Sequence, residues 1–244
     1  MPYRKEQFDN NEFYHVILRA IDDNLIFKDI NDYYRGIFSI YEFNNANPVT
    51  IQNRRRARES FKKKNRRPTS INFAEFVDDR DRLVDILAFC FMPNHVHLLL
   101  RQIKDDGLSK FMVKVGGGYG RYFNQRYQRK GYVFQNRFKS VHVEDDRQLE
   151  VVASYIFTNP IALIEPGFKE FGIRSHSVSE VGKFLEEYKW SSYPDSIGVK
   201  NFSSVTQREF LLEVMNGEVD LKDFVKNWIE RKRDIAMYTD LFLE

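Results

Sequence analysis

Two histidines within an otherwise apolar segment have a spacing that suits metal binding. His95 and His97 lie two positions apart in FMPNHVHLLL, residues 91–100. The side chains of a strand alternate between its two faces, so both imidazoles would project from one face while the aliphatic residues face a core. Imidazole suits Zn, Cu, Fe and Ni and tolerates Mn, whereas oxygen ligands suit Mg and Mn. A pair of this kind is more often structural, so it predicts a metal site only in combination with other ligands.

A tyrosine and an asparagine at helical spacing form the second candidate group. Tyr155 and Asn159 are four positions apart, and side chains at this spacing share one face of a helix. A phenol hydroxyl and an amide oxygen would therefore point together at the edge of the core, beside the stripe Leu149, Val152 and Ile156. Taken singly, such a tyrosine is usually a packing residue, and an asparagine before a proline usually ends a helix.

The elements that must position these residues can be read from the apolar patterns. In chain order, the patterns predict a strand starting at 13, a helix over 29–43, strands over 83–93 and 94–102, a helix over 107–131, a strand over 132–143 and a helix over 144–160. Asp29 and Asp145 are the expected N-caps of the first and last of these helices. This order predicts an α+β fold, with an antiparallel β-sheet and helices packed on it.

Glycines interrupt the helix predicted over 107–131. Gly116, Gly117, Gly118 and Gly120 form the sequence GGGYG together with Tyr119. Each interior glycine costs a helix about 1 kcal/mol relative to alanine, so we expect a kink or a flexible joint at this point.

Charge is distributed unevenly along the 244 residues, although the net charge is only +3. Residues 52–67 carry nine lysines and arginines against one glutamate, and residues 101–140 carry ten against two aspartates. From residue 165 onward, fifteen acidic residues outnumber eleven basic ones. A basic middle and a mildly acidic tail predict a body that binds a polyanion and a separate C-terminal part.

Length and pattern also predict the organisation of the chain. We expect one catalytic or binding domain over 1–195, with a basic insert at about 45–80, and a helical C-terminal extension over 196–244. The single cysteine, Cys90, excludes an internal disulfide framework and a zinc site with several cysteines. The N-terminal residues are polar and no apolar stretch approaches ~20 residues, so we expect no signal peptide, no membrane span and a reducing, cytoplasmic location.

Several blocks together resemble a known family. PNHVHLLL matches the HUH motif, histidine–hydrophobic–histidine, of the single-tyrosine transposases. Downstream, GLSKFM, RYFNQRYQRKGYVFQNRFKS, YIFTNPIALI and YKWSSY look like successive blocks of the REP-associated tyrosine transposase branch. The resemblance spans residues 10–195 and implies the HUH nuclease fold of ferredoxin-like topology, with the two histidines on a central strand and the tyrosine on a helix.

The resemblance implies a role for each candidate residue. His95, His97 and Asn159 correspond to the ligands of a Mg²⁺ or Mn²⁺ ion, and Tyr155 corresponds to the nucleophile. The implied activity is that of a transposase and endonuclease that cleaves and rejoins single-stranded or hairpin DNA through a 5′-phosphotyrosine intermediate. The chemistry explains these residue types, because a cation withdraws charge from the phosphate and a phenol with a pKa of ~10 needs help to attack.

Basic and aromatic residues alternate in RYFNQRYQRKGYVFQNRF, residues 121–138. Cations can follow a DNA backbone while rings stack on bases, each stack contributing ~1–3 kcal/mol. We expect at least half of these rings to be core residues instead. The predicted DNA-binding residues are Arg54, Arg55, Arg56, Lys62, Lys63, Lys64, Arg121, Arg126, Arg129, Lys130, Gln135, Asn136, Arg137 and Lys139.

The sequence departs from the family pattern in two ways. GGGYG stands where relatives carry a continuous basic helix, and the basic insert is longer than the usual connection. His142 and His176 receive no family role, and we interpret them as structural or surface residues. His15 lies in the first predicted strand, where the family also tends to place a histidine, and we interpret it as structural. The glycines leave two arrangements open, an active site completed within one chain and one completed by the helix of a partner in a homodimer.

Two other classes of function compete with the transposase hypothesis. One is a transposase-derived protein that binds repeated palindromic DNA without cleaving it, which the retention of all four candidate residues argues against. The other is an RNA-binding or structural protein in which the histidine pair is incidental, which the multi-block resemblance argues against. The sequence does not identify the DNA that would be recognised.

Overall fold

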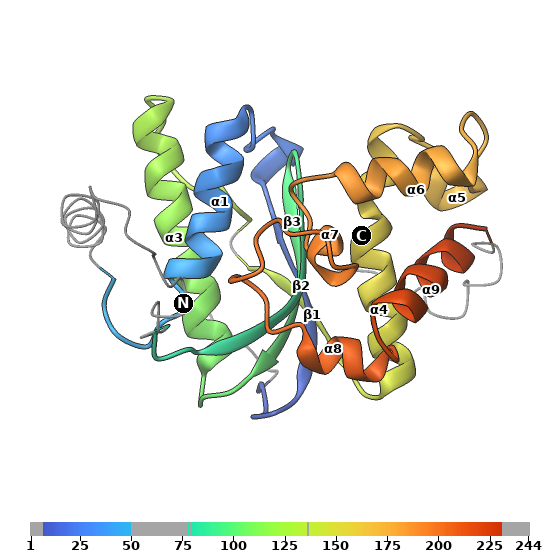
Figure 1. The fold of residues 1–244 in the computed structure, drawn as a ribbon. Helices are drawn as coiled ribbons and strands as arrows, with labels where there is room; N and C mark the ends of the chain where they lie inside the picture. The colour runs from blue at the N-terminus through green and yellow to red at the C-terminus, as the bar shows by residue number, and fades with distance from the viewer. Residues whose placement is uncertain (1–6, 50–77, 79, 136, 231–244) are drawn as a thin grey trace, which may run out of the picture.

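A four-stranded antiparallel sheet lies between two layers of helices in the computed structural model of the chain (Figure 1). The structure describes residues 7–49, 78, 80–135 and 137–230. The strands are β1 (Phe13–Arg19), β2 (Val84–Met92), β3 (His95–Gln102) and β4 (Lys139–Val143). Their order in the sheet is β2-β3-β1-β4, so β3 and β1 are the central strands. The predicted α+β class is confirmed.

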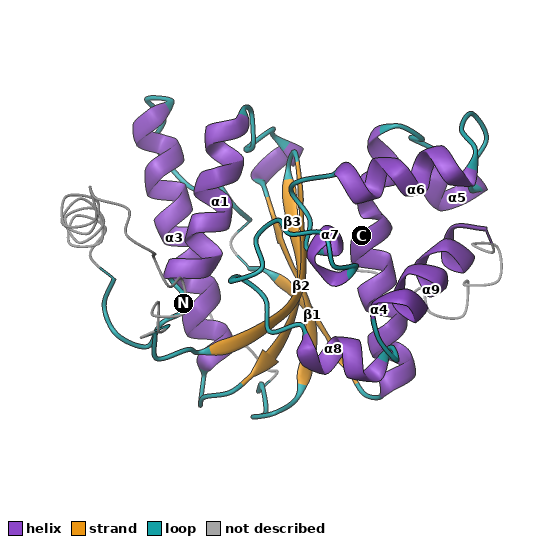
Figure 2. Ribbon diagram, in the orientation of Figure 1, coloured by secondary structure: helices purple, strands orange, loops and turns teal. Residues whose placement is uncertain are grey.

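The long helices divide between the two faces of the sheet (Figure 2). Helices α1 (Ile30–Glu42) and α3 (Gly107–Arg126) lie side by side on one face. On the other face lie α4 (Asp146–Thr158), α6 (Val178–Glu187) and α9 (Glu218–Glu230). The shorter helical segments are η1 (Ile21–Asp23), η3 (Asn159–Leu163), α5 (Phe168–Phe171), α7 (Tyr193–Ser196) and α8 (Glu209–Val214).

Strand alternation sorts the residues of β1 and β3 between the two faces. The aliphatic residues that join the core under α1 and α3 are Val16, Leu18, Val96, Leu98 and Leu100. The intervening residues, His15 and His97 among them, face α4, because consecutive side chains of a strand point to opposite faces. The predicted arrangement of the histidine strand, with imidazoles on one face and aliphatic residues on the other, is confirmed.

The caps predicted for two helices are present. The Asp29 side chain accepts hydrogen bonds from the backbone N–H groups of Asn31 and Asp32 at the start of α1. The Asp145 side chain accepts one from the N–H of Gln148, 2.7 Å away, at the start of α4. Each bond satisfies a donor that the first turn of a helix leaves without an intrahelical partner.

The kink predicted at GGGYG is wrong, because α3 continues through all four glycines as one α-helix. The physical reason is a tertiary contact. A Cβ atom on Gly118 would lie 2.1 Å from the ring of Phe43, the residue that caps the C-terminus of α1. The glycine thus allows α3 to approach α1 closely, and the packing of the two helices outweighs the low helix propensity of the segment.

The strand predicted over 132–143 is also too long, since β4 begins only at Lys139. Phe134 makes a single isolated bridge to Ala20, and the N–H of Gln135 donates to the carbonyl of Arg19, 2.9 Å away. The bridge of Ala20 to Phe134 is two residues out of register with the pairing of Ile17 with Lys139, so the ladder between β1 and β4 is interrupted before Lys139.

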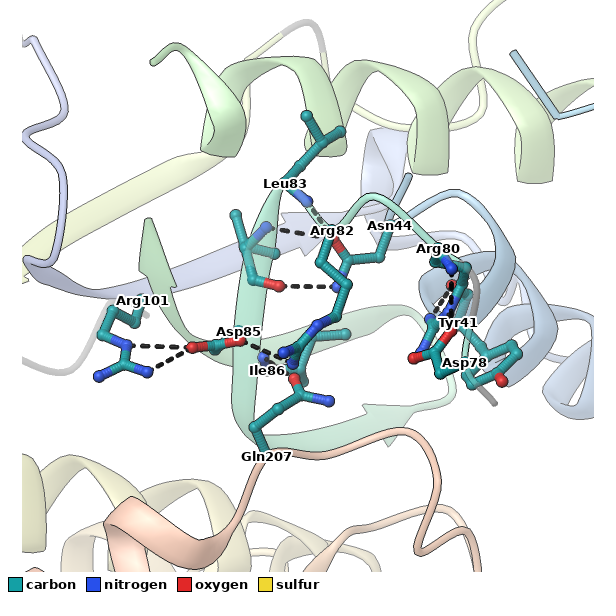
Figure 3. A network of polar contacts seen from close by, with 11 residues as sticks. Tyr41, Asn44, Asp78, Arg80, Arg82, Leu83, Asp85, Ile86, Arg101 and Gln207 are labelled. Atoms are coloured by element: carbon teal, nitrogen blue, oxygen red, sulfur yellow. Dashed lines mark hydrogen bonds and ion pairs between the residues drawn. The ribbon is translucent and has the colours of Figure 1, made fainter. Parts of the chain in front are cut away.

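The outer edge of β2 is covered by two segments from the C-terminal half of the chain. The N–H of Phe91 donates to the Trp190 carbonyl at 2.9 Å, and the N–H of Ser192 donates to the Phe89 carbonyl at 3.0 Å. Further along, the N–H of Ile86 donates to the side chain of Gln207 (Figure 3). These bonds occupy groups that an edge strand otherwise leaves available to a second sheet.

Polar side chains fix the start of β2 (Figure 3). The Asn44 amide accepts from the N–H groups of Leu83 and Val84 and donates to the Val84 carbonyl. The Asp85 carboxylate lies between two guanidinium groups, those of Arg82 at 2.8 Å and Arg101 at 2.5 Å. These contacts hold the β2–β3 hairpin, which carries His95 and His97.

The helical C-terminal region packs on the domain rather than standing apart from it. Leu221, Val225, Trp228 and Ile229 of α9 belong to the same buried cluster as the α4 stripe Leu149, Val152 and Ile156. The boundary predicted at residue 196 stays a prediction. Among the described residues, no helix combines the length and apolar character needed to cross a membrane.

The Gly118–Phe43 contact generates a stability prediction. Gly118→Ala should lower the free energy of unfolding by about 1–3 kcal/mol, because the added methyl group overlaps a buried ring. The matched control is Gly117→Ala, since a Cβ at that position meets nothing within 4 Å. The control should raise the free energy of unfolding by up to ~1 kcal/mol through helix propensity. Urea unfolding followed by circular dichroism measures both, and equal effects of the two substitutions would contradict the packing role of Gly118.

Candidate active site

The two histidines of β3 meet in a buried position over the face of the sheet that α4 covers. His95 is 8% exposed and His97 is fully buried. Their Nε2 atoms lie 3.0 Å apart, so the inner nitrogens of both rings converge on one point. The central position of β3 explains this burial, because the strand has neighbours on both sides and helices on both faces.

The outer nitrogen of each ring is also held. Nδ1 of His95 lies 2.6 Å from the Asn94 side-chain oxygen, and Nδ1 of His97 lies 3.1 Å from Nε2 of His15. An amide oxygen can only accept, so His95 must carry a proton on Nδ1 and present a lone pair at Nε2. Hydrogen bonds of this kind fix the orientation and tautomer of a metal-binding histidine.

His15 was predicted to be structural, and the structure places it beside the candidate residues. It is fully buried on β1, where the register pairs Ile17 with His97. His15 therefore lies diagonally across from His97 on the same face of the sheet. The sequence alone does not reveal this contact, because it depends on how β1 pairs with β3, a strand some 80 positions further along the chain.

Tyr155 and Asn159 complete the group from the opposite side. Tyr155 lies near the end of α4 with its ring edge-on to His15 and His97, at centroid distances of 5.8 and 5.6 Å. The Asn159 side chain affects the pKa of both Tyr155 and His95, so it lies close to both. The structure thus brings together the four candidate residues that the sequence predicted, and both Tyr155 and Asn159 are more deeply buried than the predicted core edge implied.

Burial sets the protonation states of the site. It lowers the pKa of His95 to about 3, with smaller contributions from the positive charges of Arg19 and Lys169. The pKa of His97 is also lowered well below its ordinary value, first by burial. Burial raises the pKa of Tyr155, and the hydrogen bond with Asn159 opposes that shift. At neutral pH the site therefore holds neutral imidazoles and a protonated phenol.

Two cationic side chains border the site. Arg19 is the partner of His95 in the β1–β3 register and pairs with Asp23 at 3.2 Å. The Lys169 ammonium, on α5, lies 5.6 Å from the centroid of the Tyr155 ring. Both charges lower the pKa of His95 and His97, so the potential at the site is positive and suits an anionic group.

The donor atoms fit a divalent ion. Two ligand atoms bound at right angles, each roughly 2.1 Å from an ion, lie about 3.0 Å from each other, which is the separation of the two Nε2 atoms. The third donor is an amide oxygen, that of Asn159, next to His95. Within the described residues no group of three or more His, Cys, Asp or Glu side chains could hold a metal. The candidate metal ligands therefore have to include the Asn159 amide oxygen in addition to the two histidines.

Seven of the predicted DNA-binding residues are solvent-exposed in the described part of the chain. Arg121 and Arg126 are exposed in the last turns of α3, Arg129 and Lys130 just after it, Gln135 and Arg137 in the following segment, and Lys139 at the start of β4. Lys139 pairs with Ile17, so its side chain belongs to the face of the sheet that carries His15 and His97. Arg54, Arg55, Arg56, Lys62, Lys63, Lys64 and Asn136 lie outside the described residues.

Arg126 has a structural partner that the sequence did not reveal. Its guanidinium bonds to Asp29 at 2.5 Å and to the buried Asp32 at 2.7 Å. Asp32 also accepts hydrogen bonds from the hydroxyls of Tyr122 and Tyr127. Arg126 thus ties the end of α3 to the start of α1, and its contact with DNA stays a prediction.

Fold and site define an α+β domain with a buried His–His–Tyr–Asn cluster between the sheet and a helix. Residues 47–159, which include all four members of the cluster, match the sequence model of a family described as "Transposase IS200 like". Over this segment the chain is similar to the IS200-like transposases. The predicted resemblance to single-tyrosine transposases is thereby confirmed.

One solved structure matches the chain over most of its length. It is described as "Structure of the REP associates tyrosine transposase bound to a REP hairpin". The match has a TM-score of 0.46 at 13% sequence identity, and it covers 83% of this chain and 90% of that one. No curated protein sequence matches the chain.

The cluster generates a prediction about stability. Tyr155→Phe should change the free energy of unfolding by no more than about 1 kcal/mol, because it removes a hydroxyl but keeps the buried ring. Ile156→Ala, at the adjacent fully buried position, should cost 2–5 kcal/mol, roughly the range for a large-to-small core substitution. Urea unfolding measures both. A loss as large for Tyr155→Phe as for Ile156→Ala would mean that the hydroxyl is a structural element of the core.

Proposed function

We propose that this transposase cleaves and rejoins single-stranded DNA, presented as or beside a hairpin, through a 5′-phosphotyrosine linkage to Tyr155. Mg²⁺ or Mn²⁺ would be held by His95, His97 and Asn159. The observation that carries the proposal is the convergence of the His95 and His97 Nε2 atoms, 3.0 Å apart, beside the Tyr155 ring, whose centroid lies 5.6 Å from that of the His97 ring. The candidate metal ligands are therefore adjacent to the candidate nucleophile, Asn159 follows Tyr155 by four positions, and all four residues come from the same chain.

The proposed reaction is a pair of transesterifications. The Tyr155 hydroxyl oxygen attacks the phosphorus of the scissile phosphodiester and loses its proton. The bond from phosphorus to the 3′ oxygen breaks, and that oxygen leaves as a 3′-hydroxyl after taking up a proton. Attack by a 3′-hydroxyl on the phosphotyrosine reverses the step and restores Tyr155. One phosphoester bond is formed and one broken each time, so rejoining needs no external energy source.

Different residues of the chain have different roles in this reaction. When bound, the divalent ion would withdraw charge from a non-bridging phosphate oxygen and orient the phosphate. The neutral imidazoles of His95 and His97 offer lone pairs for that ion, and Asn159 orients the Tyr155 hydroxyl. Burial raises the pKa of Tyr155, so the phenol is protonated before attack and its oxygen becomes a nucleophile only once phosphate and cations are in place.

The surrounding charges favour a phosphodiester as the substrate. Arg19 and Lys169 approach the cluster from two different sides, one from β1 and one from α5. A positive potential in a site sheltered from water strengthens the attraction of a phosphate and stabilises the added negative charge of the transition state. Tyr155 is only 5% exposed, so the entering phosphate must displace side chains that cover it, and Lys169 lies over its ring.

The proposed chemistry predicts a covalent protein–DNA product. Labelled single-stranded hairpin DNA from the sequence that flanks the gene, incubated with Mn²⁺, should yield a slowly migrating band on a denaturing gel. The band should vanish with EDTA and with Tyr155→Phe, because the first removes the cation and the second removes the attacking oxygen. Tyr132→Phe is the matched control, since Tyr132 is 76% exposed and reports nonspecific attack by an accessible tyrosine.

The same assay separates the competing functions. DNA binding without a covalent band at any flanking sequence would contradict cleavage and favour a transposase-derived DNA-binding protein. A band that survives Tyr155→Phe would contradict the assignment of the nucleophile.

The position of Lys169 generates a further prediction. Lys169→Met should slow formation of the covalent product by about tenfold or more, because a cation beside the Tyr155 ring is lost. Lys169→Arg should retain much of the rate. Lys183→Met is the control, because Lys183 is an exposed residue of α6 near Glu187. Single-turnover kinetics measures the rates, and equal rates for Lys169→Met and the control would exclude a role for the Lys169 charge.

A further inference from the structure

A third histidine contacts the candidate metal ligands from the neighbouring strand. His15 is fully buried, and its Nε2 lies 3.1 Å from Nδ1 of His97. The two rings are stacked, with centroids 5.3 Å apart and an interplanar angle of 21°. This contact uses the nitrogen of His97 that points away from His95, so it does not compete with the point on which the two Nε2 atoms converge.

The contacts between the rings assign the protons of this chain of rings. His95 donates from Nδ1 to Asn94, so its Nε2 has no proton. The 3.0 Å contact between the two Nε2 atoms then needs a proton on Nε2 of His97. A neutral His97 protonated at Nε2 has a lone pair at Nδ1, and that lone pair accepts from Nε2–H of His15.

A bound ion requires a different distribution of the same protons. Both Nε2 atoms must then present lone pairs, so neutral His97 carries its proton on Nδ1 instead. That proton points at Nε2 of His15, which must accept it and therefore carry its own proton on Nδ1. Each ring keeps one proton, and only the nitrogen that holds it changes, so no net charge is gained or lost.

We propose that His15 is a positioning residue for His97: its Nε2 accepts the Nδ1 proton of His97 and so keeps the lone pair of His97 Nε2 directed at the ion. This inference rests on the proposed function, because it concerns the same metal site. Only a side chain that can both donate and accept at this position suits the metal-free and the metal-bound arrangement. An imidazole has that property, whereas a ring that merely filled the space would not need nitrogen atoms.

The register of the sheet explains why His15 can contact His97. Ile17 is the direct partner of His97 on β1, and His15 is the next residue of β1 on the same face. The other two histidines lie elsewhere and bond to carboxylates, His142 to Glu12 at 2.7 Å and His176 to Glu165 at 2.9 Å. His142 is therefore a suitable control on a neighbouring strand.

Metal affinity tests the proposal without reference to DNA cleavage. Mn²⁺ binding to the full chain, measured by titration calorimetry, should be about 10–100-fold weaker in His15→Phe, the usual cost of losing a partner that orients a ligand. His15→Gln should lose less, since its amide oxygen can accept the His97 proton. His142→Phe should bind Mn²⁺ with the wild-type affinity.

A spectroscopic measurement distinguishes positioning from packing. Long-range ¹H–¹⁵N spectra of the wild-type histidines with saturating Mg²⁺ should show His97 and His15 both protonated at Nδ1. In metal-free protein, both should be protonated at Nε2. A purely structural His15 would keep one tautomer in both states, and that result would overturn the proposal even if His15→Phe does not fold.

The outcomes separate this inference from the proposed function. Wild-type protein that binds Mn²⁺, with folded His15→Phe binding it equally well, would overturn the role of His15 and leave the proposed function standing. Wild-type protein that neither binds Mn²⁺ nor forms the covalent product would overturn the metal-dependent function itself.

Discussion

The alternation of side chains along the two central strands is the constraint on which the rest of the structure depends. On one face, β1 and β3 contribute the aliphatic residues that bind α1 and α3 to the sheet. The same alternation turns His15, His95 and His97 toward α4. A shift of one residue in either strand would exchange the two sets and place imidazoles in the core and aliphatic side chains under α4. The register that buries the aliphatic residues in the core therefore also places the histidines at the candidate site.

Burying three imidazoles, a phenol and an amide is costly unless their polar atoms find partners. For the imidazoles the cluster meets this condition through contacts that run from Asn94 through His95 and His97 to His15, and the Tyr155 ring lies edge-on to His15 and His97. The i,i+4 spacing of Tyr155 and Asn159 serves this network, since the two side chains reach the histidines together from the end of α4. The hydrogen bonds that stabilise the buried cluster are therefore the same ones that orient its candidate ligands.

Local pattern and resemblance predicted the elements and four of the site residues, and the errors share one physical origin. His15 was missed because its contact with His97 depends on strand register rather than on spacing. The kink at GGGYG was wrong because Phe43, far from Gly118 in sequence, packs against that glycine. The partners of Arg126 were missed because the sequence does not show that Asp29 and Asp32 lie beside it, and its contact with DNA stays a prediction. Each case needs a partner that only the folded chain supplies.

The pairing of Arg126 also bears on where a DNA strand would run. The Arg126 guanidinium is bonded to Asp29 and Asp32. The other exposed cations of the basic segment run from Arg129 and Lys130 at the end of α3 to Lys139 at the start of β4. Between them the chain passes the end of β1, where Gln135 bonds to the backbone of Arg19. Arg19 is in turn the partner of His95. Through the backbone of Arg19 the basic segment is therefore connected to the pair of strands that carries the candidate metal ligands.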